Sequence, residues 1–166
     1  AYEKWDGTFF AWTYPEVFFQ LRRPVLKPQG EPWEEGEIFL GLAERLGLLP
    51  EGLDALSRAA EKDRAAFGME LLQFLGKNPK ALAVVPFVLA KTLGRAMGSS
   101  HLAALWGLLQ TAPTTFQENA ARAGFRPGPL MAEEIFQAIL DHPEGLWVGK
   151  CDPENNLASL QTSDGK

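Results

Sequence analysis

The sequence predicts a mainly α fold: a helical domain with an irregular aromatic N-terminal arm and a small β element near the C-terminus. Apolar residues recur every three or four positions from residue 32 to residue 141, the period of helices that face a core. The first 31 residues lack that period and hold three prolines and many aromatic rings. A short apolar run at 146–148 is typical of a strand. With 166 residues, the chain is long enough to bury a core.

These patterns divide the chain into three segments. Residues 1–31 form an extended arm, residues 32–141 a helical domain, and residues 142–166 a short β and loop tail that we expect to be truncated. Position 1 is not Met, and the hairpin signal Asp164-Gly165 is followed by a single residue. We therefore expect the chain to be an excised piece of a larger protein.

The arm is crowded with aromatic side chains. Phe10, Trp12 and Tyr14 alternate along the chain as the residues of a half-buried strand do. So many rings on irregular backbone need a partner surface, either the helices of this chain or a domain of the parent polypeptide. We expect the second, so the rings should be unusually exposed in this chain. The rings of the arm are those of Trp5, Phe9, Phe10, Trp12, Tyr14, Phe18 and Phe19.

The first predicted helix starts at Pro32, a residue suited to the first helical position. Three acidic residues, Glu34, Glu35 and Glu37, suit the positive end of its dipole. The helix carries one predicted buried stripe with the spacing i, i+4, i+8 and ends at Gly47, which fits a left-handed cap. The residues of the stripe are Ile38, Leu42 and Leu46.

Further helices follow, each with its own apolar face. A short helix spans Glu51–Lys62, and Asp63 is a predicted N-cap for the next one. Asn78-Pro79 signals another start, and Pro86 should kink or restart that helix. The predicted inward residues of these helices are Leu53 and Leu56; Phe67, Leu71, Phe74 and Leu75; and Leu82, Val85, Leu89 and Leu93.

The last helices and strands are bounded by local signals. Ser99 or Ser100 caps one helix, and Thr115–Glu118 fits a capping box for the next, which Gly124 stops. His142-Pro143 ends the final helix. The predicted inward residues are Leu102, Leu105, Trp106 and Leu109, then Met131, Ile135, Ile139 and Leu140. The predicted strands of the tail are Leu146–Val148 and Leu157–Leu160.

Composition excludes several classes of function. The net charge is −5, and no basic cluster exists beyond Arg22-Arg23, which argues against nucleic-acid binding. A single Cys excludes an internal disulfide and a cysteine-ligated iron–sulfur cluster. No apolar run approaches the roughly 20 residues of a membrane span. No signal peptide is recognisable in these residues. The compartment is unknown from the sequence, with the cytoplasm slightly favoured.

The sequence offers no catalytic or metal-ligating constellation. His101, His142 and Cys151 lack the spacing that places two ligands on one helix face. Cys151 has no His in a pattern that would activate a thiol, and the scattered glycines form no phosphate-binding loop. We therefore expect no catalytic residue, no metal site and no cofactor held by this chain alone.

The order of residues from Glu3 to Gly47 resembles the molybdopterin oxidoreductases of the dimethyl sulfoxide reductase, formate dehydrogenase and nitrate reductase type. In that family a Glu, a Gly-Thr and a Glu-Gly-Arg-x-Gln precede a Gly-Glu step and a helix ending in Leu-Gly. This chain has Val17-Phe18 where the family has Gly-Arg. The matching residues are Glu3, Gly7-Thr8-Phe9, Glu16, Gln20, Arg22-Arg23-Pro24, Pro28, Gly30-Glu31 and Ile38-x-x-x-Leu42-Ala43-x-x-Leu46-Gly47.

The resemblance implies a supporting segment of an oxidoreductase. The parent enzyme would hold molybdenum in a bis-pterin guanine dinucleotide cofactor, with or without an iron–sulfur cluster, and pass electron pairs between a small-molecule substrate and a redox partner. The partner of this chain would be the remainder of its own polypeptide. Four residues would face the cofactor domains, namely Gly7, Thr8, Gln20 and Arg22, with Arg23 as the other guanidinium available to a pterin phosphate.

A second interpretation belongs to a different class. The same helical pattern with an exposed aromatic arm is typical of a free-standing protein-interaction module without enzymatic activity. The two differ in what the chain binds, because a segment docks onto the rest of one polypeptide and a module binds a separate protein.

Overall fold

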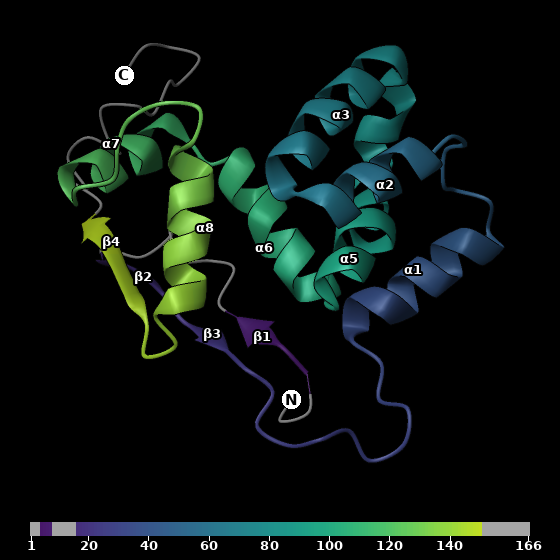
Figure 1. Cartoon of the computed structure of the whole chain (residues 1–166), viewed down its shortest axis with the longest axis horizontal. Coiled ribbons are helices and arrows are strands. Elements are labelled where there is room, and N and C mark those ends of the chain that lie inside the picture. The colour runs from purple at the N-terminus through teal and green to yellow at the C-terminus, as the bar shows by residue number, and fades with distance from the viewer. Residues whose placement is uncertain (1–3, 8–15, 151–166) are drawn as a thin grey trace, which may run out of the picture. The chain divides into compact units, whose positions relative to one another are not determined.

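A computed structural model describes residues 4–7 and 16–150 and confirms the mainly α fold with a small β element (Figure 1). The helices are α1 (Glu35–Arg45), α2 (Asp54–Lys62), α3 (Arg64–Lys77), the 3-10 helix η2 (Pro79–Val84), α4 (Val85–Leu89), the π-helix η3 (Ala90–Gly94), α5 (Arg95–Met97), α6 (Ser100–Gln110), α7 (Thr114–Arg122) and α8 (Met131–Asp141). The strands are β1 (Asp6–Gly7), β2 (Glu16–Phe19), β3 (Leu21–Arg22) and β4 (Leu146–Lys150).

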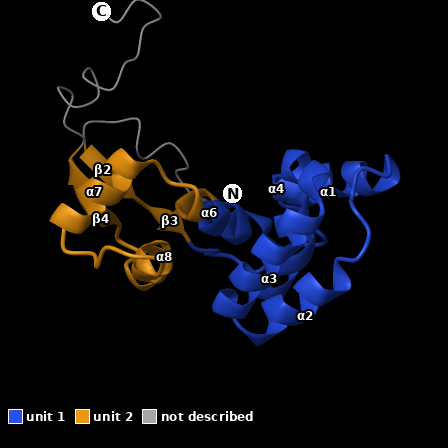
Figure 2. Ribbon diagram, turned by 90° about the horizontal axis from the view of Figure 1, so that it is seen from above, with its two compact units in different colours: residues 1–6, 23–107 blue, residues 7–22, 108–166 orange. Residues whose placement is uncertain are grey.

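The described residues fall into two compact units, coloured separately in Figure 2. Unit 1 holds residues 4–6 and 23–107, and unit 2 holds residues 7, 16–22 and 108–150. One boundary between the two units falls after Gly107. Helix α6 runs through it without a break.

Unit 1 is built from helices around an apolar core. Helix α2 packs against α3 and η3, and α1 packs against α4 and η3. Phe67 is fully buried, and its ring meets that of Trp106 edge to face at a centroid distance of 5.5 Å. The predicted inward residues of α6 are all buried, as are Leu56, Leu71, Leu89 and Leu93. Leu82 was also expected on this face, but it is exposed because the chain there forms the 3-10 helix η2 instead of one continuous α-helix.

Several local signals act as predicted. Asp63 caps α3, its Oδ1 accepting a hydrogen bond from the Ala66 N–H at 2.6 Å. Gly47 follows α1 with φ +65°, the left-handed conformation that glycine adopts without strain. The chain restarts at Pro86, which lies in the first turn of α4, as its missing N–H requires. Ser99 Oγ accepts a hydrogen bond from the Leu102 N–H at the start of α6.

The predicted buried stripe of α1 is wrong. Ile38, Leu42 and Leu46 are 50%, 49% and 71% exposed, and the helix buries Leu40 and Ala43 instead. Helix α1 is apolar on two faces, so its period identifies a helix but does not decide which face meets the core. The start is also later than predicted, because α1 begins at Glu35 with Glu34 as its N-cap.

Unit 2 contains the strands β2, β3 and β4 and the helices α7 and α8. Strand β2 pairs antiparallel with β4, with Phe18 opposite Trp147 and Phe19 opposite Leu146, which confirms the predicted strand at 146–148. Helix α8 buries Ile135, Phe136 and Ile139 and ends before His142, as expected. The predicted strands at residues 10–14 and 157–160 lie outside the described residues.

Helix α7 begins differently from the prediction. It starts at Thr114 with Pro113 as N-cap, and no side chain caps it, so the predicted capping box at Thr115–Glu118 does not form. Pro113 sets an extended conformation that suits the residue before a helix. Gly124 follows the end of this helix with φ +106°.

Within the described residues, no single helix is long and apolar enough to cross a membrane, although the bent pair Pro79–Met97 and Ser100–Gln110 reaches that threshold in length and composition.

Candidate functional site

The part of the arm that the structure describes in unit 2, mainly residues 16–22, has one exposed face. From Glu16 to Arg22 burial alternates, with Val17, Phe19 and Leu21 buried and the intervening residues exposed. Successive side chains of a strand point to opposite faces, so Gln20 and Arg22 lie on one face, about 7 Å apart along the chain. Sequence reasoning did not identify this alternation, although the apolar residues at every second position signal it.

An exposed aromatic pair continues this face. Phe18 is 45% exposed and Trp147 52% exposed, and the two residues lie opposite each other in the β2–β4 pairing. The Trp147 indole N–H donates a hydrogen bond to Glu16 Oε2 at 2.7 Å, and Lys150 Nζ lies 3.8 Å from Glu16 Oε1. We call the surface formed by Phe18, Gln20 and Arg22 of the arm, together with Trp147 of the adjoining strand β4, the outer face of the arm. It offers rings for stacking, a neutral amide and a guanidinium.

The structure brings three of the four predicted site residues into neighbouring positions. Gly7 lies in β1, which pairs with β3, the strand that contains Arg22. Gln20 lies between β2 and β3 and is exposed, as is Arg22. Thr8 lies outside the described residues. Arg23, the other predicted guanidinium, is exposed and belongs to unit 1.

The expectation that all arm rings are exposed is wrong for Phe19. Its side chain is buried and meets the Phe116 ring edge to face at a centroid distance of 6.0 Å. The alternation of the strand explains the difference, because Phe19 faces the core of unit 2 and Phe18 faces outward. Trp5 is half-buried. The other rings of the arm, at residues 9, 10, 12 and 14, lie outside the described residues.

Glu34 of unit 1 is the buried charged residue that sequence reasoning missed. The pattern placed it among the acids of a helix start, but its side chain is 3% exposed and reaches a second helix. Its Oε2 accepts hydrogen bonds from the Ser100 N–H and Oγ–H, both at 2.6 Å, and from the His101 N–H at 3.3 Å. Oε1 is buried and accepts no hydrogen bond from the described residues. The carboxylate therefore caps the N-terminus of α6 from a distance of 66 residues along the chain.

Two glycines make this contact possible. A Cβ at Gly36 would lie 2.5 Å from Ser100 Oγ, and a Cβ at Gly94 would lie 3.3 Å from Ser100 Cα. Ser100 is thus enclosed between the first turn of α1 and the end of η3. The sequence signal was Gly36 itself, because a glycine inside a helix costs about 1 kcal/mol relative to alanine, and close packing of another chain segment can offset that cost.

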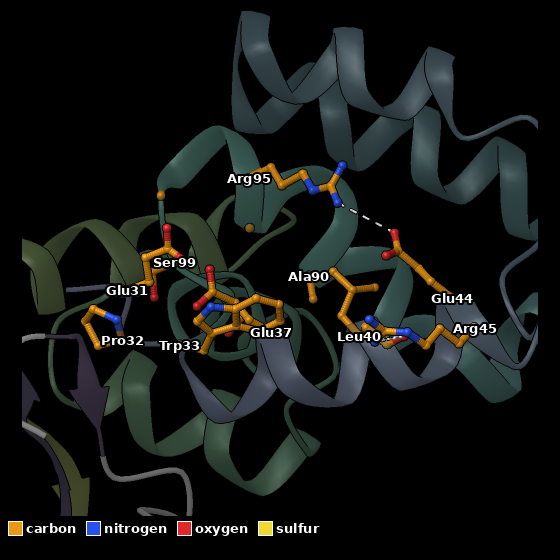
Figure 3. A pocket seen from close by; sticks show the side chains of 14 residues that line it. Glu31, Pro32, Trp33, Glu37, Leu40, Glu44, Arg45, Ala90, Arg95 and Ser99 are labelled. Atoms are coloured by element: carbon orange, nitrogen blue, oxygen red, sulfur yellow. Dashed lines mark hydrogen bonds and ion pairs between the residues drawn. The ribbon is translucent and has the colours of Figure 1, made fainter.

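A groove of about 830 Å³ lies beside this contact, also within unit 1 (Figure 3). Helix α1 forms one wall, and η3, α5 and the start of α6 form the other. Apolar side chains, those of Trp33, Leu40 and Ala90, lie between two charged ends. Glu31 and Glu37 line one end, and Glu44 lines the other, where its Oε1 lies 3.0 Å from Lys91 Nζ and 3.6 Å from Arg95 Nη2.

The contribution of the Glu44 carboxylate to stability depends on pH, and this dependence can be tested. The hydrogen bond from Lys91, followed by the charges of Lys91, Arg95 and Arg45, lowers the pKa of Glu44 from its usual 4.5. The folded state favours the charged form, so the stability from this carboxylate is present above pH 4.5 and is lost as the pH falls through the lowered pKa. We expect Lys91→Met to move the Glu44 pKa back toward 4.5, as measured by NMR titration of the side-chain carboxyl. Lys77→Met is the control, and an unchanged Glu44 pKa in Lys91→Met would contradict the assignment.

Among residues 4–7 and 16–150, no three His, Cys, Asp or Glu side chains lie together as metal ligands would. His142 follows α8 and pairs through Nδ1 with Glu144 Oε1 at 2.8 Å, and His101 lies in the first turn of α6. Cys151 lies outside the described residues.

No protein-family model, no curated protein and no solved structure matches this chain.

Proposed function

We propose that this chain is an internal helical segment of a molybdopterin-dependent oxidoreductase that supports the cofactor domains and is not catalytic alone. The observation that carries the proposal is the outer face of the arm. Gln20 and Arg22, two positions that the family resemblance assigns to the cofactor, are both exposed and lie two residues apart in a segment whose burial alternates from Glu16 to Arg22. Gly7, a third such position, lies on the strand that pairs with β3.

The chemistry of this face suits a pterin nucleotide. A guanidinium such as that of Arg22 binds phosphate oxygens through paired N–H groups. The Gln20 amide both donates and accepts hydrogen bonds, as the edge of a pterin ring requires. Phe18 and Trp147 offer exposed rings for a planar heterocycle. The cofactor would supply the redox step, and these residues would bind and orient it.

Helix α1 belongs to the same run of matching residues and is consistent with the resemblance. The resemblance implies a helix ending in Leu-Gly after the Gly-Glu step, and α1 spans Glu35–Arg45 with Leu46 as its C-cap and Gly47 in the left-handed conformation. An unrelated sequence would need both the arm and this helix in the same order.

The test is substitution of the outer face in the parent polypeptide, produced in a host that makes the molybdenum cofactor. We expect Arg22→Ala to lower cofactor affinity about 10- to 100-fold, since a charge-assisted hydrogen bond contributes about 1.5–3 kcal/mol. Gln20→Ala should have a smaller effect in the same direction. Pterin and molybdenum content per polypeptide measure both, and thermal unfolding is measured alongside to separate a loss of cofactor binding from a loss of fold.

Arg126→Ala is the matched control, an exposed arginine of the same unit that lies away from the arm in sequence. Unchanged cofactor content and unchanged turnover in both arm variants would contradict the proposal.

The second candidate function is a free-standing helical interaction module. The observation that favours it is the exposed aromatic pair of Phe18 and Trp147, which lie opposite each other in the β2–β4 pairing. Reconstitution separates the two, because a segment should dock onto the remainder of one polypeptide and a module should bind a separate protein.

A further inference from the structure

We infer that α1 is a self-association surface, on which a second copy of this chain packs its own α1 antiparallel to the first. This inference concerns unit 1 alone. It goes beyond the cofactor role proposed for the arm and does not depend on it.

The apolar face of α1 lacks a cover within the described residues. Ile38, Phe39, Leu42 and Leu46 are each about half exposed or more. They lie within one stripe of the helix, while Leu40 and Ala43 lie on the adjoining face and are buried in unit 1. Four adjacent exposed side chains of this size mark an interaction surface in a folded protein, whereas single exposed apolar residues do not.

The charged residues at the two ends of the stripe are complementary to those of a second, antiparallel copy. Glu35 lies at its start and Arg45 beside its end, both exposed and ten residues apart, about 15 Å along the helix. In an antiparallel pair centred on Leu40, each Glu35 lies opposite Arg45 of the other copy. In the same pair, Ile38 of each copy lies opposite Leu42 of the other. A parallel pair would instead place like charges together, so the charges select the antiparallel, twofold arrangement.

The other acidic residues near the stripe, Glu37 and Glu44, already pair with basic residues of unit 1. Glu37 lies 3.6 Å from Lys4, and Glu44 pairs with Lys91 and Arg95, all within unit 1. Arg45 donates a long hydrogen bond of 3.5 Å to the Gly41 carbonyl, which an interfacial carboxylate can readily replace. A partner of unrelated sequence would need the opposite charge order at the same spacing, whereas a second copy carries that order by symmetry.

The experiment is sedimentation velocity on the 166-residue chain over a range of micromolar concentrations. Light scattering on the same samples gives the molar mass. We expect a reversible dimer of twice the monomer mass. Leu42→Asp should leave a monomer with unchanged helical circular dichroism. Leu72→Asp is the matched control, because Leu72 is 74% exposed on α3, away from the stripe, and the dimer should persist.

A charge exchange tests the orientation. Glu35→Arg alone should weaken the dimer about tenfold, because each copy then meets Arg45 with a like charge. Adding Arg45→Glu to that variant should restore the dissociation constant, since the pair is re-formed with the charges reversed. A monomer at every concentration, equal disruption by Leu72→Asp, or no recovery in the double variant would overturn the inference. None of these outcomes bears on cofactor binding by Arg22, so the two proposals fail independently.

Discussion

Replacing Leu89 with alanine is expected to lower the free energy of unfolding by about 2–5 kcal/mol. Leu89 is 5% exposed at the end of α4, and its side chain fills the space over Gly107, where a Cβ would lie 2.5 Å from Leu89 Cδ1. A backbone held this closely by another helix cannot collapse into the cavity that alanine would leave. Guanidinium denaturation measures the loss.

Leu82 provides the control for this substitution. It belongs to the same apolar face in the sequence pattern but is 62% exposed, so Leu82→Ala should cost less than about 0.5 kcal/mol. Equal losses in the two variants would contradict a buried Leu89 and an exposed Leu82.

Replacing Glu34 with alanine is expected to lower the free energy of unfolding by about 3 kcal/mol. The substitution removes the acceptor of three hydrogen bonds at the start of α6, and hydrogen bonds to charged groups contribute about 1.5–3 kcal/mol each. Part of that gain is offset in the native protein, because Oε1 is buried without a hydrogen bond and the charge is desolvated. Chemical denaturation at neutral pH is the measurement.

Two further variants separate the causes of this loss. Glu34→Gln keeps an acceptor for Ser100 but removes the charge that meets the helix dipole, so its cost should lie between those of the native protein and Glu34→Ala. Glu61→Ala, at an exposed acid on α2, should cost less than about 0.5 kcal/mol. A loss in Glu34→Ala as small as that of Glu61→Ala would mean that Glu34 does not stabilise α6.

Structural features that depend only on residues adjacent in the sequence could be predicted. Asp63 as a cap, Gly47 as a helix end and the restart at Pro86 each depend on the backbone conformation of one or two residues. The inward face of α6 was also predictable, because its apolar residues recur at helical spacing, and Leu102, Leu105, Trp106 and Leu109 are all buried. Such elements need no knowledge of distant contacts.

Features decided by tertiary contacts were not predictable. Helix α1 is apolar on two faces, and the sequence does not tell that Leu40 and Ala43 turn inward while Leu42 stays exposed. Small residues decided the outcome, because Gly36 lets α1 approach Ser100, a partner on another helix. The role of Glu34 follows from the same approach. Its acidic neighbours at the helix start gave a sufficient local reason for its presence and concealed the distant one.

The outer face of the arm was predictable only in part. The resemblance indicated Gln20 and Arg22, and the alternation that places them on one face was present in the sequence from Val17 to Arg22. The surrounding prolines and aromatic residues obscured it, because Pro15 and Pro24 bound a strand of only a few residues. The pairing of β2 with β4, more than 120 residues later in the chain, required the structure.

The most direct test of the cofactor proposal is the pterin and molybdenum content of the complete polypeptide that contains these residues, purified from a cofactor-competent host. The proposal predicts stoichiometric pterin and molybdenum in that polypeptide, and a loss of both when Arg22 is replaced by alanine but not when Arg126 is. A complete polypeptide that folds but contains neither pterin nor molybdenum would contradict it.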